Sequence, residues 1–138
     1  MRLKLLTLVL VASLAGGSAA LAKNGKPPHT GGCHGRVTVV LSGTLAPDVD
    51  PQDGDTSFVL TVLHANRHGR AWKAAGSATI NVDQNTRIRR QGAHNLGALA
   101  PNDRVRVKSK VCKADLAGGG MPDLTARKVE AHPPAAGA

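Results

Sequence analysis

Four cationic side chains alternate along one short segment, and cations in this arrangement could bind a polyanion. They lie between Asn102 and Cys112 and are Arg104, Arg106, Lys108 and Lys110. Valines or serine occupy the intervening positions, so the two-residue period predicts a strand with an apolar inner face and a basic outer face. A second alternation places Arg87 and Arg89 on either side of Ile88. These six cations are the candidate polyanion-binding residues.

The basic positions have two interpretations. Exposed Lys and Arg also keep a strand edge from pairing with another chain, so this face could simply be solvated. If the face binds a partner, an anionic cell-envelope polymer, phospholipid head groups and nucleic acid are the candidates. Single-stranded nucleic acid is disfavoured because its bases need aromatic stacking platforms. The chain has one Phe and one Trp; strand parity buries Phe58, and only Trp72 is expected to be exposed.

Carboxylates and imidazoles offer possible metal ligands at two places. One is an acidic turn that contains Asp48, Asp50, Asp53 and Asp55. Several hard oxygen ligands in one turn could hold a calcium ion weakly, although Asp, Pro and Gly are also ordinary turn formers. The other is His64 and His68, with His29 and His34 near Cys33. His64 is expected to face inward and His68 to be exposed, so both metal hypotheses rank below a plain turn and isolated histidines.

Catalytic patterns are missing from the sequence. It has no nucleophile elbow and no pair of carboxylates in an apolar setting. The glycines at 118–120 lack the strand-to-helix context that a phosphate-cradling loop requires. The sequence therefore predicts a protein that is not an enzyme and needs no cofactor.

The first residues have the features of a secretory signal peptide. Arg2 and Lys4 precede an apolar run, and Ala20-Leu21-Ala22 forms a small-x-small cleavage site. The run of about a dozen residues is short for a membrane span, which needs about 20. Residues 1–22 are therefore predicted to be removed, and the mature protein to be secreted, either periplasmic or extracellular. It would keep 16 basic against 9 acidic side chains, a net charge of +7.

Export bears on the chemistry of the two cysteines, Cys33 and Cys112. Two cysteines in an exported protein most simply pair, and neither belongs to a Cys-x-x-Cys redox motif. Strand parity points Cys112 outward and Cys33 inward, so Gly35 or a bulge must correct the geometry. A disulfide is the prediction, and a reactive or metal-binding thiol pair is the alternative.

Alternating apolar and polar residues predict five short strands. They are expected over residues 36–45, 57–64, 78–82, 102–112 and 124–131, and a short segment over 86–90 presents Ile88 inward. Gly43 is a candidate bend, and a bulge near Arg127-Lys128 would return Val129 to the core. Residues 65–76 are expected to form a basic loop or hairpin tip.

One helical turn is expected over 95–101, where Asn95 would cap it, Leu96 and Leu99 would face the core, and Pro101 would end it. Together these elements predict a single domain over 33–132, between a flexible leader over 23–32 and a disordered tail over 133–138. The fold class is expected to be all-β: a small closed antiparallel barrel whose order matches the OB-fold. In that fold the first and fourth strands pair antiparallel and would bring Cys33 beside Cys112. A two-sheet sandwich is the alternative.

Several short motifs occur in a fixed order along residues 36–131. They are Gly43-Thr44-Leu45, Phe58–Val62, Asn81-Val82-Asp83, Thr86-Arg87-Ile88, Leu96–Leu99, Asn102–Val107 and Leu124-Thr125-Ala126 before Val129. In this respect the chain resembles a bacterial family of exported small OB-like β-barrel domains of unknown function. The family usually has Gly-Asp where this chain has Asn102-Asp103, and Asn tolerates the left-handed conformation that such a turn needs. The resemblance implies the fold and no catalytic residues.

The sequence thus favours a secreted, non-enzymatic β-barrel module with a structural or binding role. An envelope protein that binds a polyanion through its basic strand face is the first alternative. A weak metal-binding export protein is the second.

Overall fold

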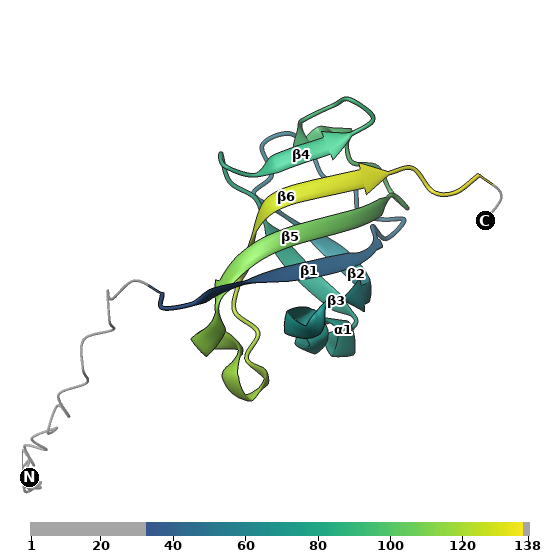
Figure 1. Ribbon diagram of the computed structural model, residues 1–138. Coiled ribbons are helices and arrows are strands. Elements are labelled where there is room, and N and C mark those ends of the chain that lie inside the picture. Colours follow the sequence, from purple (N-terminus) through teal and green to yellow (C-terminus); the bar gives the residue numbers. More distant parts are fainter. Residues whose placement is uncertain (1–32, 137–138) are drawn as a thin grey trace, which may run out of the picture. The chain divides into compact units, whose positions relative to one another are not determined.

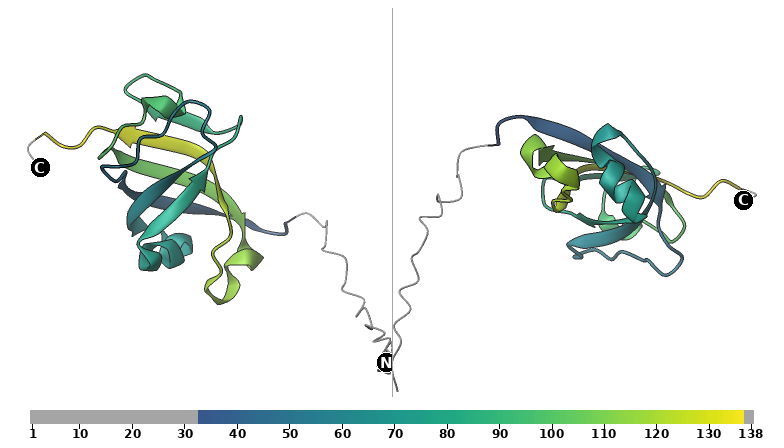
Figure 2. Two further views of the ribbon diagram at one scale, coloured as in Figure 1. Left: turned by 180° about the vertical axis from the view of Figure 1, so that it is seen from behind. Right: turned by 90° about the horizontal axis from the view of Figure 1, so that it is seen from below.

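The computed structural model describes residues 33–136. The predicted signal peptide, the leader and the last two residues of the tail lie outside this range. Six strands form one sheet, and they are β1 (Arg36–Thr44), β2 (Ser57–Ala65), β3 (Ser77–Asn81), β4 (Arg87–Arg90), β5 (Arg104–Cys112) and β6 (Leu124–His132). Figure 1 looks onto the side where β4, β6, β5 and β1 lie next to one another, and β2 and β3 form the opposite wall (Figure 2).

The sheet closes into a five-stranded barrel. Its strand order is β3-β2-β1-β5-β6, and pairing of β3 with β6 closes the ring, while β4 is added beside β6. The expected antiparallel pairing is confirmed for β1–β2, β1–β5, β2–β3 and β5–β6, but β3 and the added β4 both pair parallel with β6. A ring of five strands cannot alternate direction at every step, so at least one pair must be parallel. The segment expected over 86–90 is a separate sixth strand.

The antiparallel β1–β5 ladder confirms the predicted pairing of the first strand with the strand before Cys112. It runs without a break from Arg36 opposite Cys112 to Thr44 opposite Arg104. The inner residues of β5 are buried, as the alternation predicts, and Ser109 is buried among the valines. The core is aliphatic apart from Phe58 and Trp72. Within residues 33–136, no helix is long and apolar enough to cross a membrane.

Two bulges curve the sheet. In β2, Val62 pairs with Gly43 and His64 with Ser42, so Leu63 is the extra residue. In β6, Lys128 pairs with Lys108 and Ala126 with Ser109, so Arg127 is the extra residue. The second bulge confirms the predicted irregularity, and Val129 is buried.

Gly43 explains how β1 and β2 approach each other at the first bulge. A Cβ atom at this position would overlap the carbonyl oxygen of Thr61. Only glycine lets the two backbones come this close, which confirms the predicted bend.

Residues 65–76 form helix rather than the expected loop. A 3₁₀ turn, η1 (Arg67–Gly69), leads into α1 (Arg70–Ala75), and Gly76 ends the helix in the left-handed conformation. Asn66 caps η1 by accepting from Gly69 N, and it ties the turn to β1 by donating to Thr38 O at 2.8 Å. The helix packs against β2 and β3 at one end of the barrel (Figures 1 and 2) and places Trp72 in the core.

The predicted helical turn before β5 is the 3₁₀ turn η2 (Leu96–Ala98), with Leu96 and Leu99 buried. Asn95 does not cap it with its side chain, which instead donates to Asp53 at 2.9 Å. Asn102 adopts the left-handed conformation (φ 66°), as expected for the turn into β5. A last 3₁₀ segment, η3 (Lys113–Gly119), connects β5 to β6.

Candidate functional site

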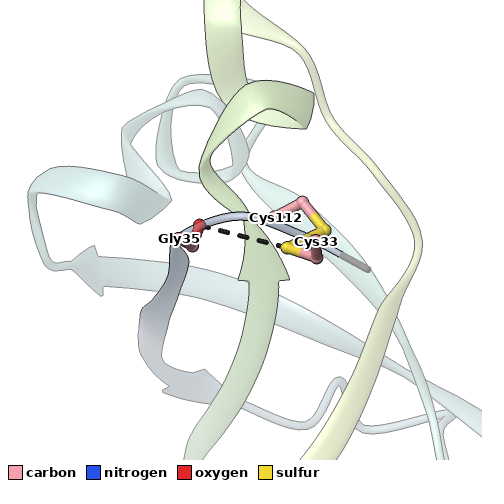
Figure 3. The surroundings of a disulfide bond; sticks show 3 residues. All are labelled: Cys33, Gly35 and Cys112. Carbon is pink, nitrogen blue, oxygen red and sulfur yellow. Dashed lines mark hydrogen bonds between the residues drawn. A yellow bond between two sulfur atoms is a disulfide. The ribbon is translucent and has the colours of Figure 1, made fainter. Parts of the chain in front are cut away.

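The disulfide between Cys33 and Cys112 is present and joins the start of β1 to the end of β5 (Figure 3). The two Cα atoms are 5.6 Å apart and 79 residues apart in the chain. Gly35 lies in the left-handed region (φ 82°) and turns the chain, which is the correction that strand parity required. Cys33 Sγ lies 3.9 Å from Gly35 O. This contact is not a hydrogen bond, because the sulfur belongs to the disulfide and carries no proton. The cysteines therefore close the barrel and leave no free thiol.

Strand register brings all six predicted cations together on one outer surface. One row across β5, β6 and β4 consists of Arg106, Glu130 and Arg89. The next row consists of Lys108, Lys128 and Arg87. We define the basic face as the outward cations of these three strands, which are Arg87, Arg89, Arg104, Arg106, Lys108, Lys110, Arg127 and Lys128.

Positive charge is concentrated on the basic face with little compensation. Glu130 is the one carboxylate in β4, β5 and β6, and it forms an ion pair with Lys128 at 2.6 Å. The hydrogen bond from Lys128, helped by the charges of Lys128, Lys108 and Arg106, lowers the pKa of Glu130. Lys108 lies directly opposite Lys128, and like charges in that position are destabilising. The spacing of the cations on this face therefore costs stability through charge repulsion between neighbouring strands.

One arginine of β4 is excluded from this face. Arg90 turns toward the fully buried Asp103, to which its Nε donates at 2.5 Å and its Nη2 at 3.0 Å. The bond to Asp103 raises the pKa of Arg90. Asp103 also accepts from Ala100 N at 2.9 Å, so it anchors both β4 and the turn before β5. This buried pair was not identified from the sequence, because Asp103 resembles any acidic turn residue and Arg90 is 13 residues away in the chain.

The four aspartates of the acidic turn are not gathered into a metal site. Asp53 accepts from Asn95 Nδ2 and from Gly97 N at 2.7 Å, and these two hydrogen bonds lower its pKa. Asp55 accepts from Gln52 N at 2.8 Å. Among residues 33–136, no three His, Cys, Asp or Glu side chains are grouped so as to hold a metal ion. The turn therefore ties the β1–β2 connection to η2.

Two expectations about the histidines are wrong. His64 is exposed rather than inward, because the bulge at Leu63 turns both residues to the outside. His68 is half-buried rather than exposed, and its Nε2 accepts from Arg67 Nε at 3.0 Å. His29 lies outside the described residues.

Both aromatic side chains are buried. Phe58 and Trp72 are each 4% exposed, so the expectation that Trp72 is exposed is wrong. Trp72 enters the core because residues 70–75 are helical. The chain has no Tyr and no other Phe or Trp, so it offers no exposed aromatic ring on which a base could stack.

A concavity of about 560 Å³ lies where the basic face meets β1 and β2. Its lining residues come from β1, β2, β5 and β6 and are Ser42, Gly43, Thr44, Leu63, His64, Arg104, Val105, Arg106 and His132. Arg104 and Arg106 were candidates for polyanion binding in the sequence, and His64 was a candidate metal ligand. The other lining residues carry no local signal, because four strands and the β2 bulge bring them together.

No protein-family model, curated protein or solved structure matches this chain.

Proposed function

We propose that this protein is an exported, non-enzymatic binding module that holds an anionic polymer of the cell envelope on its basic face. The observation that carries the proposal is the register that aligns cations of β4, β5 and β6 on one outer surface with a single carboxylate among them. The disulfide and the absence of a spanning helix within residues 33–136 are compatible with export. We also propose that the fold is OB-like and that the chain is related to the exported barrel family that it resembles.

The geometry of β5 suits a linear polymer. Its four outward cations occupy alternate positions, so successive charges are about 7 Å apart along the strand. A chain with regularly spaced anionic groups could contact them in sequence. The negative charge of the polymer would also relieve the repulsion between Lys108 of β5 and Lys128 of β6, which lie opposite each other on neighbouring strands.

Nucleic acid is the less suitable polyanion. Proteins that bind single strands combine a basic groove with aromatic stacking platforms. Phe58 and Trp72 are buried. The chain therefore has cations that could contact the phosphate backbone of a nucleic acid, but it has no exposed aromatic ring on which a base could stack. A polymer whose anionic groups carry no base fits this surface better.

Salt-dependent retention of the mature protein on an immobilised anionic polymer tests the proposal. Replacing Arg104, Arg106, Lys108 and Lys110 by Gln should lower the salt concentration at which the protein elutes, because exposed charges act through screened attraction. A control should change the net charge equally elsewhere, through Gln at the exposed Arg67, Arg70, Lys73 and Lys113. The control should elute near the unmodified protein. Equal elution of the two variants, or no change in the first, would overturn the proposal.

A further inference from the structure

The outer surface changes character between β2 and β5. Val59 and Leu63 lie on the outward side of β2 and are 46% and 50% exposed, which is unusual for large apolar side chains in this barrel. The outward side of β5, two strands away, is cationic. The concavity lies at the boundary, with Leu63 on one side and Arg104 and Arg106 on the other.

The β2 bulge creates the apolar side of this concavity. Because Leu63 is the extra residue, it and His64 both turn outward instead of alternating across the sheet. Gly43, which pairs with Val62 at this bulge, also lines the concavity. The bulge therefore places an exposed leucine and an imidazole together in the lining.

The other side of the concavity offers hydrogen-bond donors and positive charge. Arg104 Nε donates to Pro133 O at 3.3 Å, which holds the guanidinium at the edge of the concavity. Arg106 and the imidazoles of His64 and His132 add donors, and no carboxylate belongs to the lining. The nearest acid in the ladder, Glu130, lies opposite Arg106 and is paired with Lys128.

We propose that this concavity binds an amphiphilic anion, with a phosphate or carboxylate head on Arg104 and Arg106 and an apolar chain on Leu63 toward Val59. Arginine is suited to such heads because its donors match both oxygens of the anion. A volume of about 560 Å³ is in the range of small-ligand sites. The inference deepens the proposed function, since it shares Arg104 and Arg106 with the basic face and adds an apolar requirement.

The head and the chain can be tested separately on the mature protein with its disulfide. NMR titration would use n-dodecyl phosphate and dodecanoate below their critical micelle concentrations, inorganic phosphate as the head alone, and dodecyl maltoside as the chain with a neutral head. Saturable binding of both amphiphilic anions is expected, at least 10-fold tighter than inorganic phosphate or dodecyl maltoside. The largest changes in NMR chemical shift should occur at Leu63, His64, Arg104 and Arg106. Equal affinity for inorganic phosphate, or binding only to vesicles containing phosphatidic acid, would overturn the proposal.

Two variants and a matched control assign the contacts. Leu63→Thr replaces the apolar side chain with a polar, β-branched one that suits a strand, and it should remove most of the advantage of dodecyl phosphate over inorganic phosphate. Replacing Arg104 and Arg106 by Gln should lower the affinity for dodecyl phosphate at least 10-fold. Gln at Arg87 and Arg89 removes the same charge from the far side of the basic face and should leave that affinity within about twofold, given screening over such distances. An unchanged affinity in Leu63→Thr would overturn the apolar contact.

The same variants separate this inference from the polymer proposal. Leu63→Thr should leave retention on the anionic polymer unchanged, because it removes no charge. Gln at Arg87 and Arg89 should weaken retention on the polymer. If polymer retention fails in the unmodified protein while dodecyl phosphate still binds at the concavity, the polymer proposal is wrong and the amphiphile site stands.

Discussion

At the scale of single residues, hydrogen-bond partners distinguish carboxylates that look alike in the sequence. Asp103 is buried and bound by Arg90, Asp53 joins Asn95 to Gly97, and Glu130 compensates a small part of the basic face. Each of these acids has a structural partner within residues 33–136. On β4, β5 and β6, by contrast, positive charge outweighs the single carboxylate of Glu130.

Asp53 should give the protein part of its acid sensitivity. Its pKa is lowered in the folded state, so its contribution to stability is complete above the ordinary pKa near 4 and is lost as the pH falls through the lower folded value. Asp53→Asn should therefore reduce the drop in Tm between pH 6 and pH 3, measured by circular dichroism.

Asp48→Asn is the control for this prediction. It makes the same charge change in the same turn, at a carboxylate with no hydrogen bond to residues 33–136. The unmodified protein and Asp48→Asn should show the same drop in Tm. If Asp53→Asn shows that drop too, the hydrogen bonds of Asp53 do not control the acid response.

At the scale of secondary structure elements, a few side chains hold irregular pieces to the barrel. Asn66 bonds η1 to β1, Gly43 lets β2 bulge against β1, and Trp72 secures α1 in the core. β4 is an edge strand, because within residues 33–136 it has a full ladder on one side only. It depends on its ladder with β6, on Ile88 and on the pair between Arg90 and Asp103.

Removing one carboxylate oxygen should loosen β4. Asp103→Asn leaves the Arg90 guanidinium incompletely paired at a site where its side chain is 21% exposed. The expected loss of unfolding free energy is about 2–4 kcal/mol. This loss is no larger than that of breaking a fully buried ion pair, because Arg90 keeps some contact with water. Urea denaturation measures the loss, and hydrogen exchange should show faster exchange at the amides of β4.

Glu130→Gln makes the same chemical change in an exposed pair. Lys128 and Glu130 are each about one-third exposed, so this variant should lose no more than about 1 kcal/mol. Equal losses in the two variants would mean that burial of Asp103 adds nothing to the strength of its pair.

At the scale of the whole barrel, the disulfide and the β1–β5 ladder act together. The bond lies at one end of that ladder, beside the Arg36–Cys112 pair. It shortens the unfolded chain by closing a loop of 79 residues. Among residues 33–136 the core contains 19 buried apolar residues, of which only Phe58 and Trp72 are aromatic, so a small aliphatic interior relies on this covalent closure.

Replacing both cysteines by Ser should lower the unfolding free energy by about 4 kcal/mol, the chain-entropy value for a loop of this length. Urea denaturation of the mature protein measures it. The basic face should keep its affinity for the anionic polymer under folding conditions, because the bond lies at the end of the sheet. Thiol titration of the denatured, non-reduced protein should find no free thiol, and two free thiols would refute the pairing.

The sequence by itself determined what depends on neighbours along the chain. Alternation identified the faces of β1, β2 and β5 and the cations of the outer surface, and the spacing of a helical turn identified Leu96 and Leu99 as core residues. It also placed the bend at Gly43 and the bulge near Arg127, because glycine and a broken alternation are local signals.

Only the tertiary structure decided how these pieces combine. The parallel pairing with β6 follows from closing an odd number of strands, and a short segment such as 86–90 becomes a strand because β6 offers it a partner. Residues 65–76 became helical because Asn66 bonds to β1 and the core accepts Trp72. The concavity at Leu63 and Arg104 depends on register across four strands. Contacts between distant segments have no signature in local residue order, and they decide where this protein carries its candidate sites.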